Sequence, residues 1–223
     1  VNSPFSNLTV FTEVIQDGML DLIDAGKLEF ASGTSLTPSP DGLKRLYANI
    51  AEYRKKIVLR PQEIANSPET ARRLGIIAMN TAIEFDIYGH VNSTHIMGSK
   101  MMNGIGGSGD FARNGKLTFF FTSSIAKKGD ISSIVPMCSH IDHTEHDVDV
   151  FVTERDIADV RGLSPKQRAQ VIIDKCAHPT YQPMLQDYFD RACKATGNAH
   201  TPHIMEEALS WHARFLQTGS MKK

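Results

Sequence analysis

A glycine-rich segment is the part of the sequence best suited to holding an anion. It runs from Asn103 to Phe111 and reads Asn-Gly-Ile-Gly-Gly-Ser-Gly-Asp-Phe. Glycine adopts positive φ readily and has no Cβ, so this backbone can approach a ligand closely. Consecutive N–H groups in such a turn can bind a phosphate or the negative oxygen of a tetrahedral intermediate. A flexible turn is the alternative, and the spacing matches neither the P-loop nor the dinucleotide fingerprint.

Two glutamates stand where β-rich runs end. Glu13 terminates the alternating run at residues 8–14, and Glu154 follows the run at residues 148–153. Open α/β sheets collect catalytic groups at the carboxyl ends of their strands, so the two carboxylates could lie at a cleft edge. A solvated or salt-bridged surface glutamate is the alternative for each.

A histidine-rich run contains the residue types of a zinc site. His140, His143 and His146 follow Cys138, with carboxylates between them. In a strand or loop, however, this spacing does not point three rings at one spot. The sequence therefore predicts hydrogen bonding within a loop here, and no bound metal.

Two further polar stretches could line a cleft or could simply be well-paired turns. Residues 88–95 carry two histidines and several hydroxyl groups after an apolar element. The turn that starts at Lys127 follows a β-rich run and could meet a phosphate, and a solvated turn is the alternative.

The elements that would position these residues alternate between strand and helix. Helical patterns cover residues 18–25 and 43–53, and short β-rich runs precede or follow them. Residues 75–85 are apolar and fit either a helix or a strand. Later strands are expected at residues 117–122, 131–137 and 148–153. The last third is helical, with starts at Ser164-Pro165, Pro183 and Thr201-Pro202. This order predicts an α/β fold.

Composition narrows the class of protein. The chain has 223 residues, of which 41% are hydrophobic and 22% charged, with a formal net charge of -1. That charge argues against nucleic-acid binding, although a local patch could still hold a small anion. No apolar run approaches the roughly 20 residues of a membrane span. Three widely spaced cysteines fit a reducing cytoplasm. The start at Val1, directly before a β-rich run, suggests a piece of a longer protein.

Taken together, these segments resemble the acetyl-CoA hydrolase/transferase family, which includes succinyl-CoA:acetate and propionyl-CoA:succinate CoA-transferases. The matching stretches occur in family order at residues 12–18, 59–66, 87–95, 103–111, 139–146 and 163–165. The resemblance implies that residues 1–223 are the C-terminal catalytic domain, with the N-terminal half absent. One departure is visible, because Arg155-Asp156 stands where relatives have Gln-Gly after Thr-Glu.

The resemblance implies an open, largely parallel sheet flanked by helices, of CoA-transferase type, with a helical C-terminal end. It also implies transfer of CoA between an acyl-CoA and a small carboxylate (acetate, succinate or propionate) through a glutamyl-CoA thioester on Glu13. Gly107 would stabilise the oxyanion and contact CoA, and Asn66 and Glu154 would position the acceptor. Further CoA contacts would come from Asn103 and Lys127.

The same resemblance implies CoA and acyl-CoA as substrates, with no tightly bound cofactor. Expected partners are short carboxylates, the N-terminal half of the same enzyme and a second copy in a homodimer, without nucleic acid or membrane. Hydrolysis of acetyl-CoA by the same glutamate is the nearest alternative. A metal-dependent hydrolase built on residues 140–146 and a non-catalytic CoA-binding module are more remote.

Overall fold

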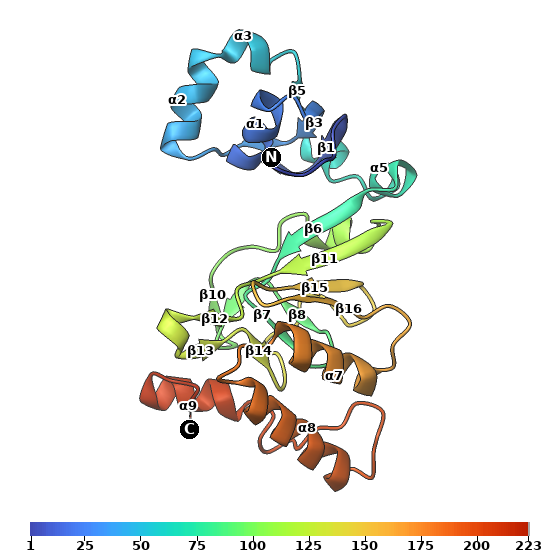
Figure 1. Cartoon of the computed structure of the whole chain (residues 1–223), viewed down its shortest axis with the longest axis vertical. Helices are drawn as coiled ribbons and strands as arrows, with labels where there is room; N and C mark the ends of the chain where they lie inside the picture. Colours follow the sequence, from blue (N-terminus) through green and yellow to red (C-terminus); the bar gives the residue numbers. More distant parts are fainter. Residues whose placement is uncertain (223) are drawn as a thin grey trace. The chain divides into compact units, whose positions relative to one another are not determined.

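The chain folds into two compact units. The structure is a computed structural model that describes residues 1–222, and its units are Val1–Ile76 and Ile77–Lys223. Figure 1 shows the elements of each, coloured along the sequence. None of the helices in residues 1–222 combines the length and apolar composition that a membrane crossing requires.

The first unit is a small parallel sheet with helical connections. Strands β1, β3 and β5 pair in parallel in the order β1-β3-β5, and the short strands β2 and β4 form a second parallel pair. The elements are β1 (Leu8–Phe11), β2 (Val14–Ile15), α1 (Asp17–Asp24), β3 (Leu28–Gly33), β4 (Ser35–Leu36), α2 (Pro40–Ala48), α3 (Ile50–Tyr53), β5 (Ile57–Leu59), α4 (Gln62–Ala65) and α5 (Pro68–Leu74).

Local sequence explains where the helices of this unit start and stop. Ser39 caps α2 by accepting a hydrogen bond from the Gly42 N–H, and Ser67 caps α5 in the same way, each followed by a proline that suits the first helical turn. Helix α5 ends at Gly75, which has a φ of 63° that glycine adopts at no steric cost. The apolar faces pack into a core around Ile15, Leu20 and Leu28, among other residues.

The second unit is built on a four-stranded sheet. Its order is β16-β15-β11-β6, in which β15, β11 and β6 are parallel and β16 is an antiparallel edge. A second sheet has the order β14-β7-β8. The elements are β6 (Ile77–Thr81), β7 (Glu84–Asp86), β8 (Val91–Asn92), β9 (His95–Ile96), β10 (Lys100–Met101), α6 (Ser108–Ala112), β11 (Leu117–Phe121), β12 (Ile125–Ala126), a 3-10 turn (Lys127–Gly129), β13 (Ile131–Ser132), β14 (Ile134–Val135), β15 (Val150–Val152), β16 (Ile157–Asp159), α7 (Pro165–Cys176), α8 (Gln182–Ala195) and α9 (Ser210–Thr218).

The core of the second unit lies on one face of this sheet. Alternation along β11 buries Phe120, and its neighbour Phe151 on β15 is also fully buried. Burying a side chain of this size stabilises the fold by roughly 1.5–3 kcal/mol. The core continues into α7 and α8 through Ile172, Ile173 and Leu185. The predicted α/β class, with parallel strands flanked by helices and a helical C-terminal end, is confirmed, and the strands are divided among several sheets.

A buried contact between a glutamate and a histidine fastens α9 to the second sheet. The Glu84 carboxylate on β7 lies 2.8 Å from Nε2 of His212 on α9, and each residue is only 4% exposed. Its other oxygen accepts hydrogen bonds from the Ser139 N–H and hydroxyl and from the Asn92 amide. Burial alone would raise the pKa of Glu84, but His212 and Ser139 outweigh it and place that pKa below its ordinary value.

Removing the partner of this buried carboxylate is expected to be costly. His212→Ala should lower the free energy of unfolding by about 3–5 kcal/mol, because Glu84 would stay buried without its main partner. His212→Gln, which keeps an N–H donor, should lose less. Arg161→Ala, which breaks a half-exposed pair with Asp159, should change stability by about 0–1 kcal/mol. Urea unfolding of the three variants measures this, and equal losses for His212→Ala and Arg161→Ala would contradict it.

Acid should weaken the same contact. A group whose pKa is lower in the folded than in the unfolded protein contributes stability above its unfolded pKa. That contribution is lost as the pH falls from the ordinary Glu84 value of 4.5 through the lower folded value. Glu84→Gln has no such ionisation, so its free energy of unfolding should fall less steeply than the wild type's below pH 4.5. Parallel stability curves for the two proteins would show that Glu84 does not titrate in this way.

Candidate active site

Glu13 sits in the turn that follows a parallel strand. It lies two residues beyond the end of β1 and directly before β2. Its carbonyl oxygen accepts hydrogen bonds from the N–H groups of Thr34 (2.8 Å), in the turn after β3, and of Ser35 (3.2 Å), the first residue of β4. Two neighbouring strands therefore end together, and their connections fix the backbone on which the Glu13 carboxylate is carried.

A glycine on β3 permits this close approach. A Cβ added at Gly33 would lie 3.0 Å from Cγ1 of Ile15 and 3.3 Å from the carbonyl oxygen of Thr12. Such contacts are tighter than a side chain ordinarily tolerates, so a larger residue would push the strand away from the Glu13 turn.

Asn66 holds the Glu13 side chain. Its amide nitrogen donates to Oε2 of Glu13 at 3.1 Å, across 53 residues of sequence. Asn66 is the C-cap of α4 and is 5% exposed, and its Oδ1 is buried without a hydrogen-bond partner in the described part of the chain. An amide does not titrate, so Asn66 keeps this donor at every pH at which the fold persists.

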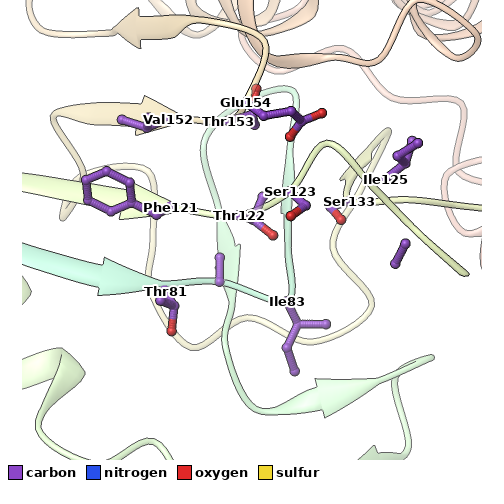
Figure 2. A pocket seen from close by; sticks show the side chains of 12 residues that line it. Thr81, Ile83, Phe121, Thr122, Ser123, Ile125, Ser133, Val152, Thr153 and Glu154 are labelled. Atoms are coloured by element: carbon purple, nitrogen blue, oxygen red, sulfur yellow. The ribbon is translucent and has the colours of Figure 1, made fainter. Parts of the chain in front are cut away.

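The second unit has a pocket at the carboxyl edge of its main sheet. Because β6, β11 and β15 are parallel, the residues that follow them meet at one edge. Figure 2 shows Thr81, Thr122, Ser133 and Glu154 around this pocket. Its lining is mostly small, apolar or hydroxyl-bearing, and Glu154 is its one ionisable member.

Glu154 is clamped by a serine that the sequence did not single out. The buried Ser124 donates its N–H to Oε2 at 2.7 Å and its hydroxyl to Oε1. Burial alone would raise the pKa of Glu154, but these hydrogen bonds outweigh it and keep that pKa below its ordinary value. The departure at Arg155-Asp156 forms a turn that is closed by a hydrogen bond from the Thr153 N–H to the Asp156 carbonyl oxygen at 3.2 Å. The Asp156 carboxylate pairs with Lys175 of α7 at 2.7 Å.

The glycine-rich segment leads into α6. Asn103 braces its start by donating from its amide to the carbonyl oxygens of Ser93 and Gly104. Gly106 has a φ of 56° and Gly107 a φ of -83°, so the left-handed region is used at Gly106. Lys127 is on a separate turn of the second unit, where its ammonium lies 4.8 Å from the centre of the Phe215 ring.

The three histidines of residues 140–146 have three different partners. His140 lies 3.3 Å from Asp142 and packs on His95, and the exposed His146 lies 3.4 Å from a carboxylate oxygen of its neighbour Glu145. His143 is fully buried and contacts a serine of α6. Within residues 1–222 no group of three or more histidine, cysteine or acidic side chains is placed to hold a metal.

Comparison with known proteins shows which family the chain belongs to. A family model described as the acetyl-CoA hydrolase/transferase C-terminal domain matches residues 42–189. The succinyl-CoA:acetate CoA-transferase of Clostridium kluyveri is 64% identical over 99% of this chain and 41% of that protein. An acetyl-CoA hydrolase of Neurospora crassa is 53% identical over 99% of this chain and 43% of that protein. The chain thus spans less than half the length of these relatives.

Solved structures share the fold. RipA of Yersinia pestis superposes with a TM-score of 0.71 at 24% identity, over 88% of this chain and 46% of that one. A 4-hydroxybutyrate CoA-transferase of Porphyromonas gingivalis gives 0.64 at 23% identity, over 83% and 46%. The resemblance found in the sequence is confirmed: the chain belongs to the acetyl-CoA hydrolase/transferase family, and the model of that family's C-terminal domain covers residues 42–189.

Proposed function

We propose that this chain is the glutamate-bearing part of an acyl-CoA:carboxylate CoA-transferase. The observation that carries the proposal is the Glu13 carboxylate at the end of a parallel strand, oriented by Asn66 at 3.1 Å. A relative that is 64% identical is a succinyl-CoA:acetate CoA-transferase, and another that is 52% identical is a propanoyl-CoA:succinate CoA transferase of Escherichia coli. The substrates are then an acyl-CoA and a short carboxylate such as acetate, succinate or propionate.

The proposed reaction uses Glu13 as a nucleophile. Its carboxylate oxygen attacks the thioester carbon, CoA leaves as the thiolate, and an acyl-glutamyl anhydride forms. The thiolate then attacks the glutamyl carbonyl, which releases the first carboxylate and leaves a glutamyl-CoA thioester. An incoming carboxylate reverses these steps and regenerates Glu13. An amide at position 13 could not form the anhydride, and a shorter carboxylate would seldom come within attack distance of the thioester carbon.

The remaining site residues would take the other roles in this reaction. Gly107 would stabilise the tetrahedral oxyanions, with further CoA contacts from Asn103 and Lys127. Glu154 has a lowered pKa and is therefore charged near neutral pH, so it would repel a carboxylate at close range. We assign Glu154 a positioning role at the acceptor, exerted through the partner groups around it and without direct contact with the acceptor carboxylate. The N-terminal half of the enzyme and a second copy in a homodimer would complete the assembly, and CoA would be present as substrate.

Hydrolysis is a second candidate, because several relatives are acetyl-CoA hydrolases, including one that is 53% identical. In that reaction water replaces the acceptor carboxylate at the glutamyl intermediate. The two activities share Glu13 and differ in how well the site excludes water. Measuring both products from one acyl-CoA, with and without added acetate, separates them.

The first functional prediction concerns the nucleophile. In the complete enzyme, Glu13→Gln should abolish exchange, and Glu13→Asp should leave a trace, because a displacement of about 1 Å can cost roughly a hundredfold in rate. Borohydride should trap the glutamyl thioester as an alcohol, which mass spectrometry would find in the tryptic peptide ending at Lys27. An unmodified peptide during active turnover, or wild-type rates in Glu13→Gln, would disprove covalent catalysis.

The second functional prediction concerns Asn66. Asn66→Ala removes the donor to Glu13 and should lower kcat by roughly tenfold to a hundredfold. Asn66→Asp places a second negative charge beside the nucleophile and should lower kcat further. Asn49→Ala is the matched control, since Asn49 is exposed and its amide donates to the Arg45 carbonyl oxygen, one helical turn back in α2. Wild-type kcat in Asn66→Asp would show that this hydrogen bond does not orient the nucleophile.

A further inference from the structure

A serine of the glycine-rich segment is connected to the buried core by one side-chain hydrogen bond. The Ser108 hydroxyl lies 2.5 Å from Nε2 of His143, which is 35 residues further along the chain. Ser108 directly follows Gly107 and is half-buried. Neither residue of this pair has a role in the reaction described above.

His143 is held rigidly at its place in the core. The residue is fully buried, and its N–H and carbonyl oxygen both pair with the backbone of Val91. Its ring packs against Phe120, with 4.9 Å between the ring centres. The ring therefore has a fixed direction, and Nε2 points at Ser108.

The surroundings of the ring determine which nitrogen carries the proton. Burial lowers the pKa of His143, and the nearby Asp142 and Asp147 do not offset it, so the ring is neutral near pH 7 and carries one proton. Nδ1 is buried without a hydrogen-bond partner in the described part of the chain. A proton there would be an orphaned buried N–H, which is rarer in proteins than an unpaired acceptor. The Nε2–H form satisfies the donor, because Ser108 Oγ accepts it.

This assignment fixes what the Ser108 hydroxyl can do. Its oxygen accepts from His143, so its own proton is available for a donor contact with another group. We propose that Ser108 donates this proton to the oxygen that becomes negative when a thioester or anhydride carbonyl is attacked, and that His143 is a positioning residue acting through Ser108. The inference rests on the proposed function for the identity of that oxygen.

A Ser-His pair can also act as a nucleophile and its base. That role requires an unprotonated Nε2 that takes the serine proton. The buried, partnerless Nδ1 argues for the opposite arrangement, in which Nε2 donates. An acylated Ser108 in the enzyme incubated with acyl-CoA would establish the nucleophilic role and overturn the proposal.

The test compares variants that remove or keep each donor, in the complete enzyme. Ser108→Ala should lower kcat by roughly tenfold to a hundredfold, with KM changed less than about threefold, because the contact strengthens as charge develops. Ser108→Thr keeps the hydroxyl, and His143→Gln keeps an N–H near the position of Nε2. Both should retain kcat within about threefold of wild type.

A double-mutant cycle separates positioning from mere structural support. His143→Leu should lower kcat about as much as Ser108→Ala, and the double variant should be no slower than Ser108→Ala alone. Thermal unfolding of each variant identifies any loss of fold, and His143→Gln keeps the test decisive if His143→Leu does not fold. Additive losses in the double variant, or equal losses in His143→Gln and His143→Leu, would overturn the proposal.

The wild type and Glu13→Gln distinguish this inference from the proposed function. Suppose that the wild type exchanges or hydrolyses acyl-CoA, that Glu13→Gln abolishes this activity, and that Ser108→Ala leaves kcat unchanged. These results together would overturn the role of Ser108 and leave the role of Glu13 in place. A wild-type enzyme that neither exchanges nor hydrolyses acyl-CoA would overturn the proposed function and this inference with it.

Discussion

Parallel strands bring their carboxyl ends to one edge of a sheet, and each candidate carboxylate depends on this constraint. Glu13 follows β1, which pairs in parallel with β3, and Glu154 follows β15, which pairs in parallel with β11. A side chain just past a strand end is no longer held by the strand's pairing, so its direction must come from another segment. Asn66 supplies that direction for Glu13, and Ser124 supplies it for Glu154.

Carboxylates also shape the loops of the second unit. Oδ1 of Asp86 accepts from three successive backbone N–H groups, those of Tyr88, Gly89 and His90, each at 3.0 Å. Asp142 likewise accepts from the backbone and hydroxyl of Ser93. Where the chain turns, its N–H groups have no neighbouring strand to pair with. A carboxylate that accepts hydrogen bonds from several of them lets irregular backbone remain buried without unpaired groups. Asp86 and Asp142 therefore have structural roles in these loops.

The positions of helices and strands could be predicted from the sequence where they depend on residues that are close together in the chain. Capping serines followed by proline marked α5 and α7 correctly, and β-rich runs marked β1, β11 and β15. Residues 75–85 were ambiguous and form strands, while residues 43–53 divide into two helices at Asn49. The helix start predicted at Thr201-Pro202 was wrong, because α9 begins at Ser210. At that point the Tyr88 hydroxyl donates a hydrogen bond to the Pro202 carbonyl oxygen, and the two residues are 114 positions apart in the sequence.

The contacts that define the candidate sites were not readable, since each joins residues far apart in sequence. Ser124 reaches Glu154 across 30 residues, and Ser108 reaches His143 across 35. The sequence of a polar run does not indicate which of its histidines is buried, yet in the structure His143 is fully buried whereas His140 and His146 are not. The same imidazole that would bind zinc when exposed among ligands becomes, when buried beside a hydroxyl, a fixed donor with one direction. Chemical role in this run is therefore set by the topology that surrounds each ring, and residue type alone does not determine it.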